Sequence, residues 1–466
     1  MSDLCSLGAS ELLDQYRKKT LSPVDVAQAV LRRIEEFNPA LNAFCLVNDK
    51  LIEEAKASES RWLKGEPKGM LDGVPVSIKD LLLTKGWPTL RGSKTVDPKG
   101  PWTEDAPAVA RLRENGALFL GKTTTPEFGW KGVTDSPLTG ITRNPWNPAK
   151  TPGGSSGGAA AALASGMGPL AIGTDGGGSI RIPCGFTGLF GIKPSFGRVP
   201  AWPLSPFSTV AHVGPMTRSV ADAALMLNVL ALPDARDWHA LPYDERDYRS
   251  RLDFGVRELR IAYSPDLGYA KVDPEVAALV RSAVKVFEEL GAKVEEKNPG
   301  FENPDAVFRA HWFPGAALLL KNIDKKQHAL IDPGLIEVAA QGAKYPMLDV
   351  LEAHQKRGAL GVHMNLFHRD YDLLVTPTLA VPAFDVGKEF PDNPKGGRWT
   401  DWTPFSYPFN LTQQPAASIP CGLTRAGLPV GLHIVGPRYA DALVLRAARA
   451  FETARPIAMP DLKKGR

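Results

Sequence analysis

Short strand-like segments alternate with helix-like segments, and this alternation constrains the fold of the chain more than any other feature. The strand-like segments lie at 73–78, 117–120, 170–173, 259–263, 292–295, 372–376, 417–420 and 429–435. The helix-like segments lie between them, at 23–37, 105–114, 159–164, 274–290 and 441–452. Strands that alternate with helices favour a mostly parallel or mixed sheet covered by helices. The sequence therefore predicts an α/β protein with a mixed β-sheet core flanked by helices on both faces.

Two further regions are predicted to be mainly helical. The first 65 residues contain a helix that starts at Ser22-Pro23 and is expected to end at Asn38-Pro39, since the residue before proline disfavours the helical conformation. Residues 300–365 form a second helical region, rich in aromatic side chains. A chain of 466 residues exceeds what one hydrophobic core usually organises, so one large or two closely joined domains are expected.

Composition excludes several functional classes. Lys and Arg are mixed with Asp and Glu along the chain and the formal net charge is only +4, so no nucleic-acid surface is indicated. The four cysteines are scattered without a CxxC pair, which argues against a disulfide framework or a zinc knuckle. Apolar stretches are broken before they reach membrane-spanning length, and the start of the chain lacks a signal-peptide pattern. A cytoplasmic protein with no membrane association is expected.

Glycines are concentrated in two runs, 153–158 and 176–179, separated by an alanine-rich helix and an apolar strand. A flexible linker would not be flanked so closely by regular structure. Residues 116–123 have the G-x-x-x-x-G-K-[ST] spacing of a phosphate-binding loop, but Gly116 is followed by an apolar strand, which fits such a loop poorly. A dinucleotide fingerprint would need one of the runs early in a strand–turn–helix unit, and neither run is placed so.

The first glycine run also satisfies the G-x-S-x-G pattern of a nucleophile elbow, so a histidine-dependent α/β-hydrolase esterase stays an alternative. That enzyme needs a later histidine as its base. His212 and His433 are the candidates, although a lone histidine is more often a packed residue. His363 and His368 do not have the spacing of a zinc-binding helix, and no metal site is predicted.

A third possibility uses a lysine in place of histidine. Lys79 follows a buried strand, where burial can lower its pKa toward the working pH of a general base. Ser155 lies in a tight glycine turn, where unusual backbone conformations are allowed. Ser179 follows three glycines whose N–H groups are unobstructed and could stabilise an oxyanion.

Taken together, these segments closely resemble the amidase signature family. The resemblance is dense between residues 70 and 225 and extends to the C-terminal segment. It is carried by the motifs at 73–80, 151–158, 173–183, 188–194, 212–216 and 427–437. It implies a single domain over 1–466 and a mixed sheet flanked by helices. It also implies no metal or organic cofactor, a small-molecule amide as substrate, and a homodimer.

The family resemblance assigns roles to individual residues. Ser179 would be the nucleophile, Ser155, joined to Gly154 by a cis peptide, would relay the proton, and Lys79 would be the base. The N–H groups of Gly176, Gly177, Gly178 and Ser179 would form the oxyanion hole. Ser156, Asp175 and Arg181 would tie the two glycine loops together. The chemistry would be hydrolysis of an amide to an acid and ammonia or amine, through an acyl-enzyme on Ser179.

One relative within the family is a competing assignment. The A subunits of glutamine-dependent tRNA amidotransferases usually continue Ser-Ile-Arg with Gln-Pro-Ala, whereas this chain has Ile182-Pro183-Cys184. Those subunits also commonly carry a threonine at the position of Gly176. Both differences favour a free-standing amidase.

The acyl pocket is expected to be apolar. Eight aromatic residues near the motifs or in the 300–365 region and beyond could contribute: Trp87, Trp102, Phe128, Trp130, Trp312, Phe313, Trp399 and Trp402. Of these, Phe128, Trp130 and Trp312, together with Gly129, are the predicted pocket residues. Such a pocket suits small aryl or other hydrophobic amides.

Overall fold

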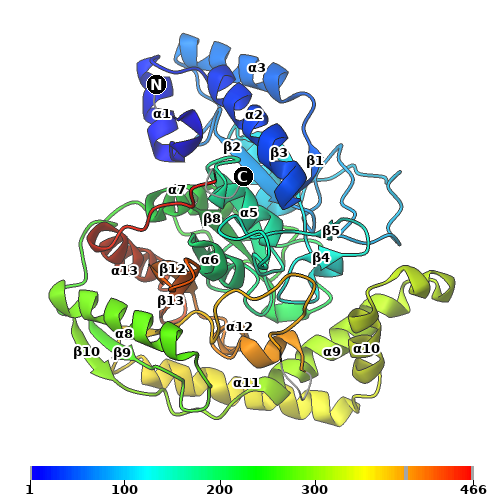
Figure 1. The fold of residues 1–466 in the computed structure, drawn as a ribbon, viewed down its shortest axis with the longest axis vertical. Coiled ribbons are helices and arrows are strands. Elements are labelled where there is room, and N and C mark those ends of the chain that lie inside the picture. Colours follow the sequence, from blue (N-terminus) through cyan, green and yellow to red (C-terminus); the bar gives the residue numbers. More distant parts are fainter. Residues whose placement is uncertain (1–2, 393–396, 463–466) are drawn as a thin grey trace.

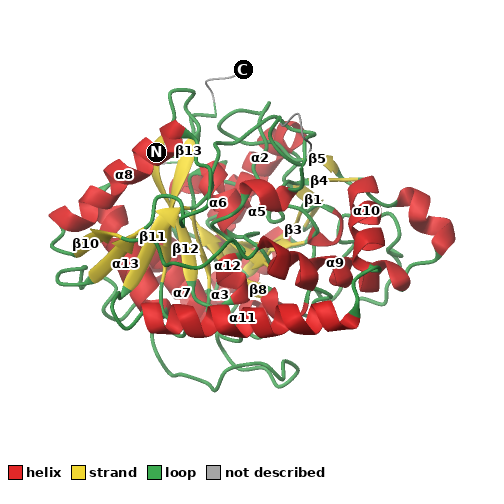
Figure 2. Cartoon of the chain, turned by 90° about the horizontal axis from the view of Figure 1, so that it is seen from below, coloured by secondary structure: helices red, strands yellow, loops and turns green. Residues whose placement is uncertain are grey.

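In a computed structural model that describes residues 3–392 and 397–462, a large mixed β-sheet organises the chain (Figures 1 and 2). Within the described residues, eleven strands form this sheet in the order β1-β3-β2-β6-β8-β7-β12-β13-β11-β9-β10. A separate hairpin joins β4 (Asp135–Ser136) and β5 (Gly140–Ile141). The strands of the large sheet are β1 (Phe44–Val47), β2 (Pro75–Lys79), β3 (Leu118–Thr123), β6 (Leu170–Asp175), β7 (Phe190–Lys193), β8 (His212–Thr217), β9 (Arg260–Tyr263), β10 (Lys293–Glu296), β11 (Leu373–Pro377), β12 (Ala416–Leu423) and β13 (Pro429–Val435).

The sheet combines two parallel groups with an antiparallel centre. Strands β3, β2 and β6 are parallel to one another, and so are β11, β9 and β10. Between the two groups, the neighbours from β6 through β8, β7, β12 and β13 to β11 pair antiparallel. The predicted α/β class with a mixed sheet is confirmed.

Helices flank the sheet on both faces. On β6, Ile172 belongs to the core cluster formed with the N-terminal helices, whereas its neighbour Ala171 packs in the cluster with α5 and α6. Successive strand residues point to opposite faces, so each face has its own apolar layer. The helices are α1 (Ala9–Lys18), α2 (Pro23–Leu41), α3 (Leu51–Lys64), α4 (Pro107–Glu114), α5 (Gly157–Ala164), α6 (Arg181–Thr187), α7 (Val220–Leu230), α8 (Pro274–Glu289), α9 (Asp305–Lys321), α10 (Pro333–Gly342), α11 (Met347–Phe367), α12 (Pro408–Leu411) and α13 (Asp441–Ala454).

Helix α2 shows how local sequence sets an element and where the prediction was wrong. The Ser22 hydroxyl accepts a hydrogen bond from the Val24 N–H, and Pro23 occupies the first helical position, as the sequence indicates. The helix does not end at Asn38-Pro39 but continues through Pro39 to Leu41. In the last turn a proline removes only one hydrogen bond, and the left-handed Asn42 then ends the helix.

The helical region predicted at 300–365 contains α9, α10 and α11, which Figure 1 shows along the lower edge of the molecule, away from α1, α2 and α3. Aromatic residues of this region and of the segment near residue 400 form a second hydrophobic core. That core lies against the loop after β6, since the aromatic rings of Phe308 and Trp312 pack over its glycines. No helix in the described part of the chain is long and apolar enough to cross a membrane.

The topology brings the predicted motifs to one edge of the sheet. Strands β2 and β6 are parallel neighbours, with Ile78 opposite Ile172. Their carboxyl ends therefore meet, and place Lys79 beside Thr174 and the second glycine run. The first glycine run precedes α5, which packs against both strands. Ligands bind at such strand ends in many α/β proteins.

Candidate active site

Lys79 is completely buried at the end of β2 and is surrounded by hydroxyl groups. Its Nζ lies 2.7 Å from Ser155 Oγ, 2.9 Å from Ser156 Oγ and 2.9 Å from Thr174 Oγ1. Burial lowers the pKa of Lys79 well below its ordinary value, and only the charge of Asp175 acts in the opposite direction. The amine is thus placed and tuned to accept a proton from a neighbouring hydroxyl.

The Ser155 turn needs glycine on its N-terminal side. The Gly154–Ser155 peptide is cis, as the family resemblance implies. A Cβ added at Gly154 would lie 2.6 Å from the backbone of Val133, a distance that no side chain tolerates. The first glycine run is therefore a tightly packed turn that fixes Ser155, in contrast to a mobile linker.

Ser179 lies on the second glycine loop, and its side chain lines the same cavity as that of Ser155. The two loops are joined directly, because the N–H of Ser156 donates to the carbonyl oxygen of Ser179 at 3.2 Å. The structure thus brings Lys79, Ser155 and Ser179 to one place. Lys79 and Ser155 are in direct hydrogen-bond contact.

Three of the four predicted oxyanion donors are free. Among the described residues, the N–H groups of Gly176, Gly177 and Ser179 donate no hydrogen bond to the protein. Gly178 is the exception, because its N–H donates to Asp175 Oδ1 at 2.7 Å and is not available to an oxyanion in this arrangement. The donor set of this structure is therefore smaller than the sequence indicated.

Asp175 and Arg181 form a fully buried ion pair beneath the loop. Arg181 Nε donates to Asp175 Oδ2 at 2.9 Å and Nη2 donates to Oδ1 at 3.0 Å. Burial alone would raise the pKa of Asp175, but the charge and hydrogen bonds of Arg181 hold it well below its ordinary value. Ser156, by contrast, joins the loops through Lys79 and the Ser179 carbonyl. These residues fix the loop that carries Ser179.

Three residues of this network were not predicted to support the Ser179 loop. Asn410 Nδ2 donates to Asp175 Oδ1 at 2.9 Å, and Ser406 Oγ donates to the carbonyl oxygen of Gly177 at 2.6 Å. His433 Nε2 lies 3.1 Å from Arg181 Nη1. Ser406 and Asn410 come from the segment around α12, more than 200 residues along the chain. Nothing local in their sequence marks them, and only the motif around His433 gave a signal.

The two candidate histidines do not contact the serines. Burial lowers the pKa values of His212 and His433 well below the ordinary value for histidine. His212 Nδ1–H donates to the Val210 carbonyl at 2.8 Å, and its Nε2 is buried without a partner in the described residues. No histidine described in the structure is hydrogen-bonded to Ser155 or Ser179, so the geometry does not support a histidine base.

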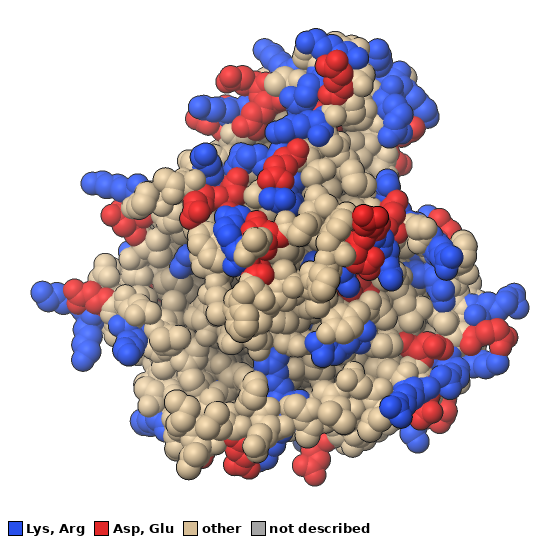
Figure 3. Space-filling model, turned by 180° about the vertical axis from the view of Figure 1, so that it is seen from behind, with Lys and Arg blue, Asp and Glu red and all other residues tan. Residues whose placement is uncertain are grey.

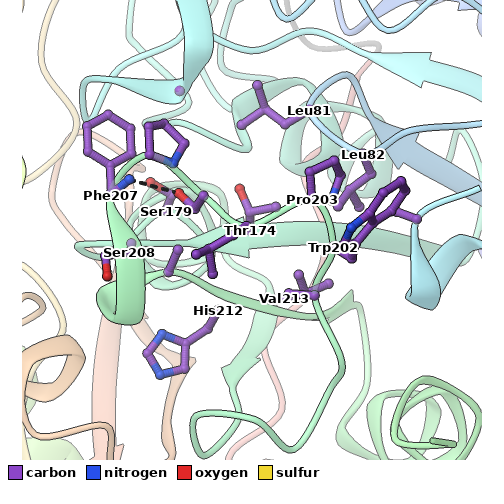
Figure 4. A pocket seen from close by; sticks show the side chains of 18 of the residues that line it. Leu81, Leu82, Thr174, Ser179, Trp202, Pro203, Phe207, Ser208, His212 and Val213 are labelled. Atoms are coloured by element: carbon purple, nitrogen blue, oxygen red, sulfur yellow. Dashed lines mark hydrogen bonds between the residues drawn. The ribbon is translucent and has the colours of Figure 1, made fainter. Parts of the chain in front are cut away.

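The cavity at the two serines has a volume of about 210 Å³ and a largely apolar wall (Figure 4). Phe128, Gly129 and Trp312 line it, as predicted. Trp130 does not line it: its ring is completely buried against Gly334, and its carbonyl accepts a hydrogen bond from Trp312 Nε1 at 3.2 Å. Trp130 thus supports a pocket residue instead of forming the wall.

The loop before β8 supplies much of the wall and was not predicted. Trp202, Pro203 and Phe207 of this loop line the cavity, and Figure 4 shows Trp202 and Pro203 grouped with Leu82, on the side opposite Phe207. The ring of Phe207 stacks on Trp312 with centroids 3.7 Å apart. Apart from one short 3-10 helix at Ser208–Val210, the loop has no regular secondary structure, and no sequence motif identified it.

The glycines of the second run make room for aromatic rings. A Cβ on Gly176 would lie 2.8 Å from the Trp312 ring, and one on Gly177 would lie 2.6 Å from the Trp399 ring. Aromatic side chains thus buttress the loop that carries the free N–H groups. Three other aromatic candidates pack elsewhere: Trp87 on Phe119, Phe313 beside Tyr345 and Trp402 on Phe186.

Similarity to known proteins decides the family. The family model described as Amidase matches residues 25–445. The chain belongs to the amidase signature family. Within the described residues, no group of three or more His, Cys, Asp and Glu side chains is arranged to hold a metal ion.

Individual relatives of this amidase span nearly its whole length. An acylamidase of Rhodococcus erythropolis is 41% identical over 458 residues, which cover 97% of this chain and 96% of the relative. A solved bacterial aryl acylamidase of the amidase signature family superimposes with a TM-score of 0.91 at 34% identity, covering 99% of both chains. The A subunit of the glutamyl-tRNA(Gln) amidotransferase of Moorella thermoacetica is 34% identical over 97% of both chains. The protein is therefore an amidohydrolase that acts on C–N bonds.

Proposed function

We propose that this amidase hydrolyses small aryl or other hydrophobic amides through an acyl-enzyme on Ser179, with Ser155 as proton relay and Lys79 as base. The observation that carries the proposal is the contact of 2.7 Å between the buried Lys79 Nζ and Ser155 Oγ. A lysine whose pKa is lowered by burial is unprotonated at a lower pH than a lysine in water. It can therefore serve as a base near neutral pH.

Acylation starts with Ser179 Oγ attacking the amide carbonyl carbon. The Ser179 proton moves to Ser155 Oγ while the Ser155 proton moves to Lys79 Nζ, so the relay returns to a neutral serine. The free N–H groups of Gly176, Gly177 and Ser179 donate to the oxyanion in this proposal, and each such donor typically contributes ~100- to 1000-fold in rate. The proton then returns through Ser155 to the amide nitrogen, the C–N bond breaks, and ammonia or amine leaves.

Deacylation uses the same three residues, with water as the nucleophile and Ser179 as the leaving group. Water attacks the ester carbonyl of acyl-Ser179 and loses its proton through Ser155 to Lys79. The C–O bond to Ser179 then breaks, the serine oxygen takes the proton back, and the carboxylic acid is released. No further group is required, since each proton is returned in each half of the cycle.

The substrate class is supported by the cavity and by the relatives. Its wall is apolar and aromatic, and Trp312 and Phe207 present flat ring surfaces. Relatives similar over nearly the whole chain include an acylamidase and an aryl acylamidase. An A-type amidotransferase subunit stays the second candidate, because such a subunit is 34% identical. Against it stands Gly176, where a larger residue would collide with Trp312.

A panel of amides tests the proposal. Amine or ammonia release is measured on acyl anilides, aryl acetamides, short alkyl amides and glutamine, without any partner protein. Turnover of the aryl and hydrophobic amides is expected, with little on glutamine. A chain that hydrolyses only glutamine would indicate the amidotransferase role, and a folded chain inactive on the whole panel would contradict the proposal.

We further propose that the enzyme forms a homodimer through α11. Leu348, Leu351, Val362 and Leu366 fall on one face of this helix and are about half exposed or more. Antiparallel packing of two copies of α11 about a two-fold axis would cover this apolar stripe.

The remaining expectations about cellular context belong to the same proposal. Lys and Arg are interspersed with Asp and Glu on the face seen in Figure 3, which supports the absence of nucleic-acid binding. The four cysteines are free thiols, which supports a reducing, cytoplasmic location and gives no indication of membrane association. We treat residues 1–466 as one domain.

A further inference from the structure

One cation lines the substrate cavity without an acceptor for its charge. Arg91 is partly buried in the wall formed by the segment after β2. Its backbone is fixed, because its N–H donates to Asp80 Oδ2 at 2.9 Å and its carbonyl accepts from the Phe128 N–H at 2.7 Å. It has a positive φ of 58°, which few arginines adopt. The surrounding structure therefore holds this residue in place against a local conformational preference.

The guanidinium group itself is unpaired. Within the described residues it donates no hydrogen bond, in contrast to three other arginines that are largely or fully buried. Arg181 binds Asp175, Arg218 donates to the carbonyls of Leu7 and Gly168, and Arg357 donates to the carbonyl of Leu411. A partly desolvated guanidinium without an acceptor is costly, so such a group is expected to meet its acceptor in a ligand.

The acid whose charge acts on Arg91, Asp80, does not neutralise it. The Asp80 carboxylate accepts the Arg91 backbone N–H and lies 3.5 Å from Lys122 Nζ, so it already has a cationic partner. Burial lowers the pKa of the Arg91 guanidinium, and the charge of Asp80 opposes this only in part. The cavity's own acid, Asp237, accepts hydrogen bonds from the backbone N–H groups of Ala201 and His239. Arg91 therefore presents to the cavity a positive charge that no acid of the protein neutralises within the described residues.

The segment that carries Arg91 lies beside the apolar part of the cavity wall. Thr89 Oγ1 donates to the Leu82 carbonyl at 3.3 Å, which holds the segment before Arg91 beside Leu82. Figure 4 shows Leu82 with Trp202 and Pro203 on one side of the cavity, with Ser179 lying toward Phe207. A substrate that reaches from Ser179 along this side would place an apolar portion against these residues and its end near Arg91.

We propose that Arg91 binds a carboxylate carried by the amide substrate, so that the enzyme prefers hydrophobic amides with an acidic group over neutral amides of the same shape. The planar guanidinium can donate two parallel hydrogen bonds to a carboxylate. Because Ser179 takes the scissile carbonyl, the carboxylate belongs to another part of the substrate. This inference rests on the proposed amidase function and specifies its substrate class.

Two matched pairs of anilides test the inference. One pair carries the substituent on the amine part (4-carboxyacetanilide and 4-methylacetanilide), and the other carries it on the acyl part (N-phenylsuccinamic acid and pentananilide). The readout is the ratio of kcat/KM for the acidic substrate to kcat/KM for the neutral one. Arg91→Met removes the charge, Arg91→Lys keeps a charge without the two-pronged geometry, and Arg281→Met is a control at a remote, exposed arginine.

In at least one pair, the wild-type ratio is expected to fall about 10- to 100-fold in Arg91→Met, as expected for loss of a hydrogen bond between charged groups. Arg91→Lys should lie between the two, and Arg281→Met should leave the ratio unchanged. Two results would overturn the inference. The first is a wild type that prefers the neutral substrate in both pairs, and this is measured without any variant. The second is an Arg91→Met variant in which both ratios are unchanged. A wild type that hydrolyses neither pair nor any amide of the panel would instead refute the proposed function itself.

Discussion

Removing Arg181 should destabilise the protein more than any exposed arginine would. Its side chain is completely buried and binds Asp175 with two hydrogen bonds, Asn410 Oδ1 at 2.6 Å and the Ser406 carbonyl at 2.9 Å. A methionine side chain is similar in length to an arginine side chain, but Arg181→Met leaves the Asp175 carboxylate buried without its cation. Breaking a buried pair in this way costs about 3–5 kcal/mol.

The corresponding change in melting temperature follows from chain length. An unfolding entropy of ~2.1 cal/mol/K per residue gives about 1 kcal/mol/K for a chain of 466 residues. Arg181→Met should therefore lower the Tm by about 3–5 °C, as measured by scanning calorimetry. The control is Arg281→Met, which breaks an ion pair with Glu296 whose side chains are 57% and 54% exposed. That variant should shift the Tm by less than ~1 °C.

A second variant separates the charge from the packing. Adding Asp175→Asn to Arg181→Met leaves neither charge of the pair unpaired. The loss of Tm in the double variant should therefore be smaller than the sum of the losses in the two single variants. An Arg181→Met Tm within the range of the Arg281→Met control would refute the view that this buried pair holds the Ser179 loop in place.

Three further predictions concern catalysis, loop packing and assembly. Because burial holds the pKa of Lys79 well below 10.5, kcat/KM should rise with pH as Lys79 loses its proton and level off well below that value. Lys79→Ala should reduce kcat ~100- to 10,000-fold without loss of fold, and a wild-type profile that still rises near pH 10 would contradict the assignment. Gly176→Thr should lower stability by about 1–3 kcal/mol in urea unfolding, since its Cβ would lie 2.8 Å from Trp312, and Trp312→Ala should partly restore it. By light scattering, wild type should be dimeric and Leu351→Glu monomeric, and a monomeric wild type would exclude the α11 dimer.

Elements with a strong local pattern could be predicted from the sequence. Helix α8 follows Asp273-Pro274, and Asp273 accepts from the N–H groups of Glu275 and Val276. Strands β2 and β6 are mainly apolar and almost completely buried, because both faces of the sheet are covered. Lys79, Ser155 and Ser179 could be selected because each stands in a motif at the end of such an element. Their proximity then follows from the parallel pairing of β2 with β6.

The remaining features depend on contacts between distant parts of the chain. Ser406 and Asn410 reach the Ser179 loop only through the fold, so their own sequence gives no indication of this role. Trp130 was assigned to the pocket as a neighbouring aromatic residue, but its ring turns into the second core. Gly178 could not be distinguished from its neighbours, because its N–H is taken by a turn that only the structure reveals.

Labelling with a serine-directed fluorophosphonate, followed by peptide mass spectrometry, tests most directly whether Ser179 is the nucleophile. The mechanism predicts stoichiometric phosphonylation of Ser179 in the wild type, much slower labelling in Lys79→Ala, and none in Ser179→Ala, which should also lose amide hydrolysis. Labelling of another serine, or amide turnover that survives in Ser179→Ala, would contradict the assignment of Ser179 as the nucleophile.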